Sequence, residues 1–402
     1  MTTADSTPPV PVRRGAVSPL YAAGFVTAFG AHSIAASLGG YTHHEHASLL
    51  TLGILLAVYD GAEIILKPVF GALADRVGPR PVLIGGLVGF ALASAAFVAA
   101  GDPALVGLAR LGQGAAAAAF SPAAGALLAR LAPARGHGRA FGSYGAWKGL
   151  GYTLGPLAGG ALVTVGGYRL LFAVLTVLAG AVCVWAAVTV PAAPPLPRRR
   201  YTLADAARAF TRRSFVLPTT ALAAASAALA TGVGFLPVRG AASGLGPLAT
   251  GGIVAALAAT AAATQPLAGR ARDSGRLPDT LGRTAGLVLT AAGFAAAAWL
   301  PALAGLPIAA LTIGAGTGLI TPLAFAALTA TTPPERLGTT LGSAEVGREA
   351  GDAGGPLLVG ALAAGLSLAA GLTGLAVLLA ALAATPLLAR HRGTPDTDHA
   401  SP

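Results

Sequence analysis

The chain has 402 residues, of which 54% are hydrophobic and only 10% are charged. Soluble domains carry about 25% charged residues, so this chain has too few charges to coat a globule, and an ordinary soluble protein is excluded. The formal net charge is +11, which raises the question of nucleic-acid binding. The positions of the basic residues along the chain decide whether this charge indicates nucleic-acid binding.

Twelve apolar runs follow one another along the chain. Each has roughly 20 residues or more, enough to cross about 30 Å of hydrocarbon. They are predicted at residues 17–39, 48–70, 81–100, 103–131, 138–165, 168–191, 214–238, 246–269, 280–300, 302–331, 338–362 and 364–388. Runs such as 216–238 and 285–331 lack the polar face of a soluble helix. Because every backbone amide must be paired within lipid, the sequence predicts an all-α integral membrane protein.

The segment before the first span contains Pro8, Pro9 and the pair Arg13-Arg14, without a small-residue cleavage site. We therefore interpret residues 1–16 as a cytoplasmic tail rather than a cleaved signal peptide. His32 lies within the first span. A satisfied core histidine is the commoner role there, and a place in a substrate or proton cavity is the alternative.

The first external loop is predicted to contain Tyr41–His46. Its three histidines, His43, His44 and His46, carry ligand atoms that suit a transition metal. Neighbours in a flexible loop seldom form a preorganised four-ligand site, however. We therefore predict a solvated loop and no metal.

Charged residues inside the second span require an explanation. Asp60, Glu63 and Lys67 are spaced by three and four residues, so they share one helical face. Each charge costs about 2.5–3.5 kcal/mol on insertion scales. Ala258 and Ala261 stand at the equivalent positions of the eighth span.

A short charged turn, GALADRVGPR, follows the second span at residues 71–80. An imperfect repeat of it, GRARDSGR, follows the eighth span at residues 269–276. In the first copy, Gly71 and Gly78 are expected to permit chain reversal and close helix approach. Asp75, matched by Asp273 in the copy, is expected to cap or pair with a neighbouring helix end. The cations of this turn, expected to meet carboxylates or head groups, are Arg76 and Arg80.

The two halves of the chain repeat one another. Residues 138–162 match 338–362 at an offset of 200, and Pro68 matches Pro266 at an offset of 198. The fifth span is thus equivalent to the eleventh and the second to the eighth. The sequence therefore predicts bundles of six spans at 17–191 and 214–388, a cytoplasmic linker at 192–213 and a cytoplasmic tail at 389–402. Parallel repeats of this kind are the plan of major facilitator superfamily transporters.

Three motifs in order carry the resemblance to that family. The turn at 71–80 resembles its signature loop, Arg110-Leu111-Gly112-Gln113-Gly114 resembles its fourth-span element, and residues 151–160, GYTLGPLAGG, resemble the fifth-span element of exporters. The small residues of that last element permit close packing, and its proline favours a kink. The members singled out for helix packing are Gly151, Gly155, Pro156, Gly159 and Gly160.

The resemblance implies twelve transmembrane helices in two pseudo-symmetric halves, with the second and eleventh spans as neighbours across the interface. Their charged residues would then form one network. It is either a structural ion-pair lattice or a proton-coupling site, and we favour coupling through Asp60 and Glu63. The proposed members of the network are Asp60, Glu63, Lys67, Arg110, Lys148, Glu345, Arg348, Glu349 and Asp352.

The sequence allows more than one role for each of the other two intramembrane cations, Arg110 and Lys148. Arg110 is a candidate for proton relay or for steering a carboxylate, with a structural hydrogen bond as the alternative, and Gln113 one turn on could support either role. Lys148 has a cationic counterpart in Arg348, so a helix-packing counterion is the safer interpretation.

Basic residues fall almost entirely in alternate loops and tails, and only Arg169 and Arg239 fall in the opposite set. By the positive-inside rule, both termini are predicted to be cytoplasmic, in a plasma or inner membrane. The basicity therefore reflects topology, and no nucleic-acid partner is predicted.

No phosphate-binding Gly-x-x-x-x-Gly-Lys-Ser/Thr loop occurs in the chain. We therefore predict a secondary transporter that is not an enzyme and needs no cofactor. It is expected to export small organic compounds by proton antiport, as a monomer in the lipid bilayer that works by alternating access. The alternative is a proton-coupled uptake symporter for a sugar or an organic acid.

Overall fold

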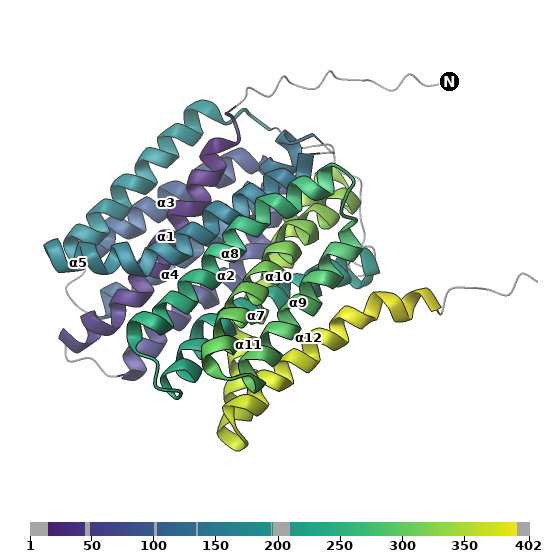
Figure 1. Cartoon of the computed structure of the whole chain (residues 1–402). Helices are drawn as coiled ribbons and strands as arrows, with labels where there is room; N and C mark the ends of the chain where they lie inside the picture. The colour runs from purple at the N-terminus through teal and green to yellow at the C-terminus, as the bar shows by residue number, and fades with distance from the viewer. Residues whose placement is uncertain are drawn as a thin grey trace, which may run out of the picture.

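The computed structural model describes residues 15–44, 49–99, 103–133, 136–193, 195 and 210–391. Within these ranges the chain is almost entirely helical and forms no strand (Figure 1). The long helices are α1 (Ser18–His44), α2 (Leu49–Val77), α3 (Pro79–Ala99), α4 (Pro103–Leu131), α5 (His137–Thr189), α7 (Arg213–Ala241), α8 (Pro247–Asp273), α9 (Asp279–Trp299), α10 (Ala302–Thr331), α11 (Leu337–Gly365) and α12 (Leu368–His391). A short 3-10 helix, η2 (Pro334–Arg336), precedes α11.

Helix α5 contains two of the predicted spans. It has 53 residues, and its backbone leaves helical geometry at Gly166 and Gly167. Gly167 has a φ of 69°, a region that glycine enters without steric cost. The chain reverses there, so the two limbs of the teal α5 correspond to the fifth and sixth spans (Figure 1).

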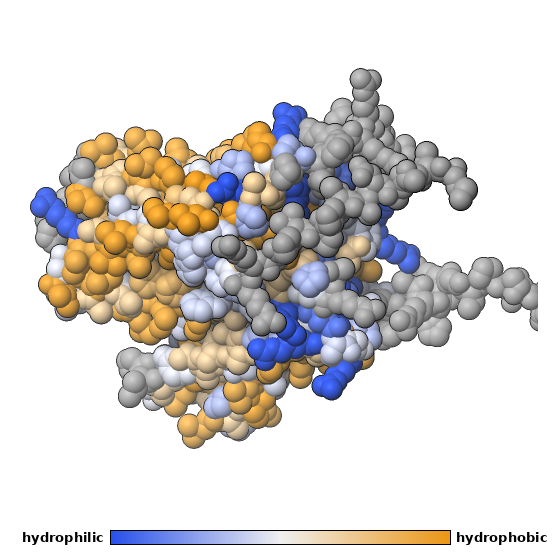
Figure 2. All heavy atoms as spheres, turned by 90° about the horizontal axis from the view of Figure 1, so that it is seen from above, coloured by the Kyte–Doolittle hydropathy of each residue, from blue (hydrophilic) through white to orange (hydrophobic). Residues whose placement is uncertain are grey.

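The outer surface suits a lipid environment. Eight of the described helices are long and apolar enough to cross a membrane. Large apolar side chains such as Leu92, Val188 and Leu303 are more than 60% exposed, and apolar residues cover much of the face seen in Figure 2. Helices α2 and α11, which carry the intramembrane carboxylates, are not among the eight.

The internal repeat is visible in the packing between the halves. Helix α2 contacts α11, and α5 contacts α8. In both pairs the backbones approach too closely for any side chain: a Cβ on Gly71 would clash with the carbonyl of Gly338, and one on Gly269 with the carbonyl of Gly138. Both pairs lie at what we call the charged end of the bundle, where α2 meets α3 and α8 meets α9.

Two predicted loops are shorter than expected. The turn expected at 71–80 is helical except at Gly78, where a single residue with a φ of 93° reverses the chain. The expectation that Tyr41–His44 belongs to an external loop is also wrong, because α1 continues through His44. His46, most of the linker and both tails lie outside the described residues.

Candidate functional site

A central cavity lies between the two halves and has two adjoining compartments. The apolar compartment, about 480 Å³, is walled by residues such as Leu229, Val254 and Phe325. The charged compartment, about 460 Å³, is lined by His32, Tyr59, Asp60, Glu63, Arg110, Glu349 and Asp352, among others. Both compartments share Lys148, Tyr152, Pro156, Ser226, Leu229, Val233 and Arg348.

Lys67 is the centre of the charge network. Its side chain is 0% exposed, and its Nζ lies 2.7 Å from Oε1 of Glu349, 3.3 Å from Oε2 of Glu63 and 3.5 Å from Oε2 of Glu345. A buried ammonium would be costly without such partners. The structure therefore brings together residues of α2 and α11, as the sequence predicted.

A second cation completes this network. Arg348 donates from Nε to Oε2 of Glu345 at 3.0 Å, and from Nη2 to Oε1 of Glu349. Glu345 and Glu349 are therefore each shared between Lys67 and Arg348. Three carboxylates compete for two cations in this cluster, so a proton or another positive charge can change how they pair.

Two further carboxylates flank the network. Asp60 is exposed to the charged compartment. No hydrogen bond or ion pair joins it to another side chain that the structure describes. Asp352 accepts a hydrogen bond from the hydroxyl of Ser226 on α7 at 3.1 Å. Asp60 is therefore the carboxylate most open to protonation from the cavity.

Arg110 is held beside the network. Its guanidinium lies 4.3 Å from the centre of the Tyr59 ring and donates to Oε1 of Gln113 at 3.1 Å. Gln113 in turn donates to Oγ of Ser94 at 3.5 Å. This arrangement fits the expected support of Arg110 by Gln113, with Tyr59 as an additional cation–π partner.

His32 and Lys148 lie near Tyr152 of α5. The His32 ring meets the Tyr152 ring at 4.4 Å, and its Nδ1 is 3.1 Å from the carbonyl of Ala28. Lys148 donates to Oγ of Ser121 at 3.4 Å and lies 5.9 Å from the Tyr152 ring. Among the described residues it forms no ion pair within 4 Å, and Glu345 is the carboxylate that acts on it electrostatically.

The charged end is closed by two matching carboxylate caps. Asp75 accepts from the backbone amides of Gly338 and Thr339, both at 2.8 Å, and from the Thr339 hydroxyl at 2.7 Å. Asp273 accepts from the amides of Gly138 at 2.9 Å and Arg139 at 2.7 Å. Each carboxylate thus caps the N-terminus of a helix in the opposite half, where unpaired amides attract negative charge.

The arginines of the charged turn have different surroundings. Arg76 is exposed. Arg80 donates from Nη2 to the carbonyl of Ala187 at 2.6 Å, so the partner that the structure shows is a carbonyl rather than the expected carboxylate. Gly78 lies so close to Ala193 that a Cβ would come within 2.6 Å of its carbonyl oxygen.

The glycine motif of α5 packs against α1. A Cβ on Gly151 would come within 2.5 Å of the Phe25 carbonyl, and Gly155 and Gly159 pack against the next two turns of α1 in the same way. The inclusion of Gly160 in this packing motif is wrong, because it points away from α1 and a Cβ there would meet no atom within 4 Å. The backbone keeps helical φ and ψ values at Pro156, and within α5 it leaves them at Gly166 and Gly167.

Several site residues were not singled out from the sequence. Phe141 of α5 and Phe325 of α10 stack at 5.6 Å across the two halves, and both line the apolar compartment. The buried Tyr144 hydroxyl and Gln265 Oε1 also lie at this compartment and form no hydrogen bond within 3.5 Å in the part of the chain that the structure describes. The repeat offset of 198 could have indicated Gln265, because it is the counterpart of Lys67.

The family comparison agrees with this architecture. Residues 20–276 match the family model described as Major Facilitator Superfamily. The chain belongs to the major facilitator superfamily. This agrees with the predicted all-α membrane fold of two pseudo-symmetric six-helix halves, and it places the protein in a superfamily of multi-pass membrane transporters rather than among enzymes.

Relatives in this superfamily include several resistance proteins. The chain is 48% identical over 93 residues to the puromycin resistance protein pur8 of Streptomyces alboniger, covering 23% of this chain and 18% of that protein. It is 34% identical over 119 residues to the class C tetracycline resistance protein of Escherichia coli, covering 30% of each. It is 31% identical over 172 residues to the probable actinorhodin transporter of Streptomyces coelicolor, covering 42% of this chain and 28% of that protein. The matched regions thus span between 18% and 30% of these relatives.

Solved structures with this fold include transporters of different kinds. The human organic anion transporter MFSD10 matches 93% of this chain and 100% of its own, with a TM-score of 0.76 and 17% identity. The Escherichia coli fucose:proton symporter FucP matches 94% of this chain and 98% of its own, with a TM-score of 0.77 and 13% identity. At these identities the likeness shows the fold alone.

Proposed function

We propose that this superfamily member exports small organic compounds in exchange for protons. The observation that carries the proposal is the Lys67 cluster, in which a fully buried ammonium is shared by three carboxylates from both halves of the molecule. Such pairs can break and re-form as the halves move. A carboxylate that loses its cationic partner in a water-poor site binds a proton more tightly, so motion and protonation become coupled.

The closed charged end supports alternating access. The Asp75 and Asp273 caps and the Phe141–Phe325 stack join the halves there. The cavity lining extends toward the other end, reaching Gly234 on α7 and Gly251 on α8. Rocking of the halves would break the caps and expose the same cavity on the opposite side.

The direction of transport rests on the relatives. Proteins named for resistance to puromycin and tetracycline are among them, which favours export of drug-like compounds. FucP shows that the same fold also serves a proton symporter, so uptake remains the alternative function.

A flux measurement on purified protein in proteoliposomes tests this function. Puromycin, tetracycline and the organic anion dansylglycine are suitable probes, with an imposed proton gradient as the driving force. We expect at least one probe to move against its concentration gradient toward the side that supplies protons, and an uncoupler to stop it. Probe movement that ignores the uncoupler would refute proton coupling, and movement in the same direction as protons would establish symport.

We also propose that the charged end faces the cytoplasm. Ser274 lies in the turn at that end and Ser243 in the turn between α7 and α8 at the other, and both are exposed. In a Cys183→Ser background, an impermeant maleimide added to intact cells should label Ser243→Cys and leave Ser274→Cys unlabelled until the membrane is permeabilised. The reverse labelling pattern would overturn the orientation.

A further inference from the structure

The two interfaces between the halves differ in charge although their helices are equivalent. Apart from the Asp75 cap, whose counterpart is Asp273, the carboxylates at the α2–α11 interface have non-acidic counterparts around α5 and α8. Asp60 and Glu63 correspond to Ala258 and Ala261, and Glu345 and Glu349 correspond to Gly145 and Gly149. The four non-acidic counterparts all line the apolar compartment. One cation is present in both halves, however, since Arg348 on α11 corresponds to Lys148 on α5.

Lys148 is accordingly a partly buried cation that forms no ion pair with a carboxylate among the described residues. Glu345 also lines the apolar compartment, but it lies within 4 Å of both Arg348 and Lys67. The only hydrogen bond that the structure describes for the Lys148 ammonium goes to Ser121 at 3.4 Å. An ammonium has three donors, so two remain for a ligand.

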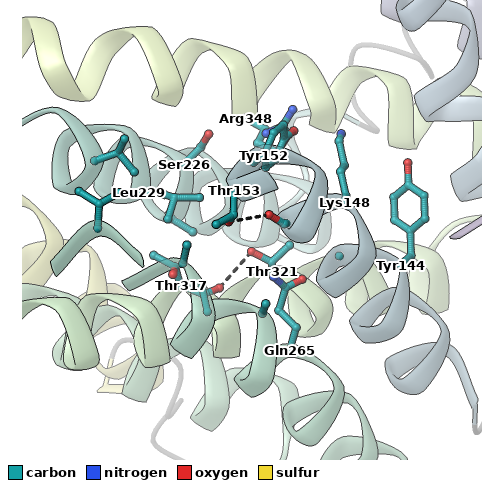
Figure 3. Close-up of a pocket in the computed structure, with 18 of the residues that line it drawn as sticks. Tyr144, Lys148, Tyr152, Thr153, Ser226, Leu229, Gln265, Thr317, Thr321 and Arg348 are labelled. Atoms are coloured by element: carbon teal, nitrogen blue, oxygen red, sulfur yellow. Dashed lines mark hydrogen bonds between the residues drawn. The ribbon is translucent and has the colours of Figure 1, made fainter. Parts of the chain in front are cut away.

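Two tyrosines extend this donor site along α5. Tyr144, Lys148 and Tyr152 are spaced by four residues, so they share one face of the helix, and all three line the apolar compartment. Figure 3 shows Lys148 between the two tyrosines. The Tyr144 hydroxyl lies near that of Ser121 but forms no hydrogen bond within 3.5 Å among the described residues, and no hydrogen bond is described for the hydroxyl of Tyr152.

The other hydroxyls of the compartment cannot compete as donors. Thr153 donates to the carbonyl of Gly149 at 3.0 Å, Thr317 to that of Ile313 at 2.9 Å, and Thr321 to that of Thr317 at 3.0 Å. The hydroxyl of Ser226 donates to Asp352. The hydroxyl donors without a backbone or carboxylate partner are therefore concentrated on the α5 face, opposite walls built from Leu222, Leu229, Val254 and Phe325.

We propose that the apolar compartment binds an amphiphilic organic anion. The anionic group of the ligand would take the place of the missing carboxylates on Lys148, with hydrogen bonds from Tyr152 and Tyr144. Its apolar body would pack against the leucine, valine and phenylalanine walls, as is usual for ligand pockets with few polar groups. This inference rests on the proposed transport function and specifies the substrate class at that site.

Equilibrium binding of a matched pair of probes tests the proposal. Dansylglycine carries a carboxylate, and dansylglycinamide has the same apolar body without the charge. With the protein in phosphatidylcholine nanodiscs and empty nanodiscs subtracted, we expect the wild type to prefer dansylglycine by about tenfold or more. Lys148→Met should remove this preference by weakening dansylglycine alone, and Lys148→Arg should keep it.

Two further variants make the result decisive. Arg239→Gln removes a cation that bonds to Ala297 and Ser243 outside the cavity, and it should leave both affinities unchanged. Tyr152→Phe removes one donor with little change of shape, and it should weaken dansylglycine selectively even if Lys148→Met fails to fold. Equal affinity of the wild type for both probes, or equal loss of both in Lys148→Met, would overturn the proposal. Because no gradient is applied, the result stands whether or not proton-driven export is found.

Discussion

Asp60→Asn should abolish proton-driven accumulation of substrate while leaving substrate binding nearly unchanged. Asp60 faces the charged compartment, and none of the described side chains pairs with it directly. Its carboxylate can therefore receive a proton from the cavity without first breaking an ion pair. Proton and substrate fluxes measured together in proteoliposomes would show the loss of coupling, and passive exchange of substrate should persist.

Glu63→Gln should have a related but different effect. Glu63 lies 3.3 Å from Lys67, so neutralising it leaves the ammonium with Glu345 and Glu349 and stabilises one pairing of the network. We expect slower transport together with the loss of coupling. Glu335→Gln, a carboxylate in η2 away from the cavity, serves as the control and should behave as the wild type.

One experimental result would contradict the proposed coupling role of Asp60 and Glu63. If Asp60→Asn and Glu63→Gln both concentrate substrate at the wild-type proton ratio, this pair is structural. The coupling carboxylate should then be sought among Glu345, Glu349 and Asp352. Asp352 would come first, because its described partner is the neutral hydroxyl of Ser226.

Neutralising both caps should open the charged end. Each of Asp75 and Asp273 accepts charge-assisted hydrogen bonds from amides of the opposite half. An asparagine has one acceptor oxygen and no charge, so the double variant Asp75→Asn/Asp273→Asn should shift the equilibrium toward opening by about tenfold or more. Flux should fall because the closed state is depleted, while expression and insertion stay nearly intact.

Spin-label distances across the charged end measure this shift. Labels at Ala132→Cys on the N-terminal half and Thr331→Cys on the C-terminal half, in a Cys183→Ser background, should move apart in the double variant. Asp279→Asn is the matched control, because Asp279 binds Arg272 at 2.7 Å within its own half. Wild-type distances and wild-type flux in the double variant would mean that the caps do not act as a latch.

Local pattern accounts for the parts of this protein that were correctly predicted. Span length and apolar composition indicated the membrane helices, and the repeat at offsets of 198 and 200 indicated two halves. The cost of charge in lipid singled out Asp60, Glu63 and Lys67. The prediction that Asp75 caps a helix end was also correct, although only the tertiary packing shows that this helix is α11 in the opposite half.

Tertiary packing decided which groups meet. The spacing of Glu63 and Lys67 places them on one face of α2, but only the approach of α11 supplies Glu345 and Glu349 to the same ammonium. Gly159 packs against α1 and the adjacent Gly160 does not, since neighbouring residues on a helix point about 100° apart.

The cavity-lining face of α5 also depends on both local spacing and tertiary packing. The spacing of Tyr144, Lys148 and Tyr152 is visible in the sequence, but their common face lines the cavity only because α5 packs against α1 on one side and α8 on another. Helical periodicity determines which residues share a face. The long-range arrangement of the helices determines whether that face meets lipid, a neighbouring helix or the cavity, and contacts between residues over 100 positions apart leave no local pattern.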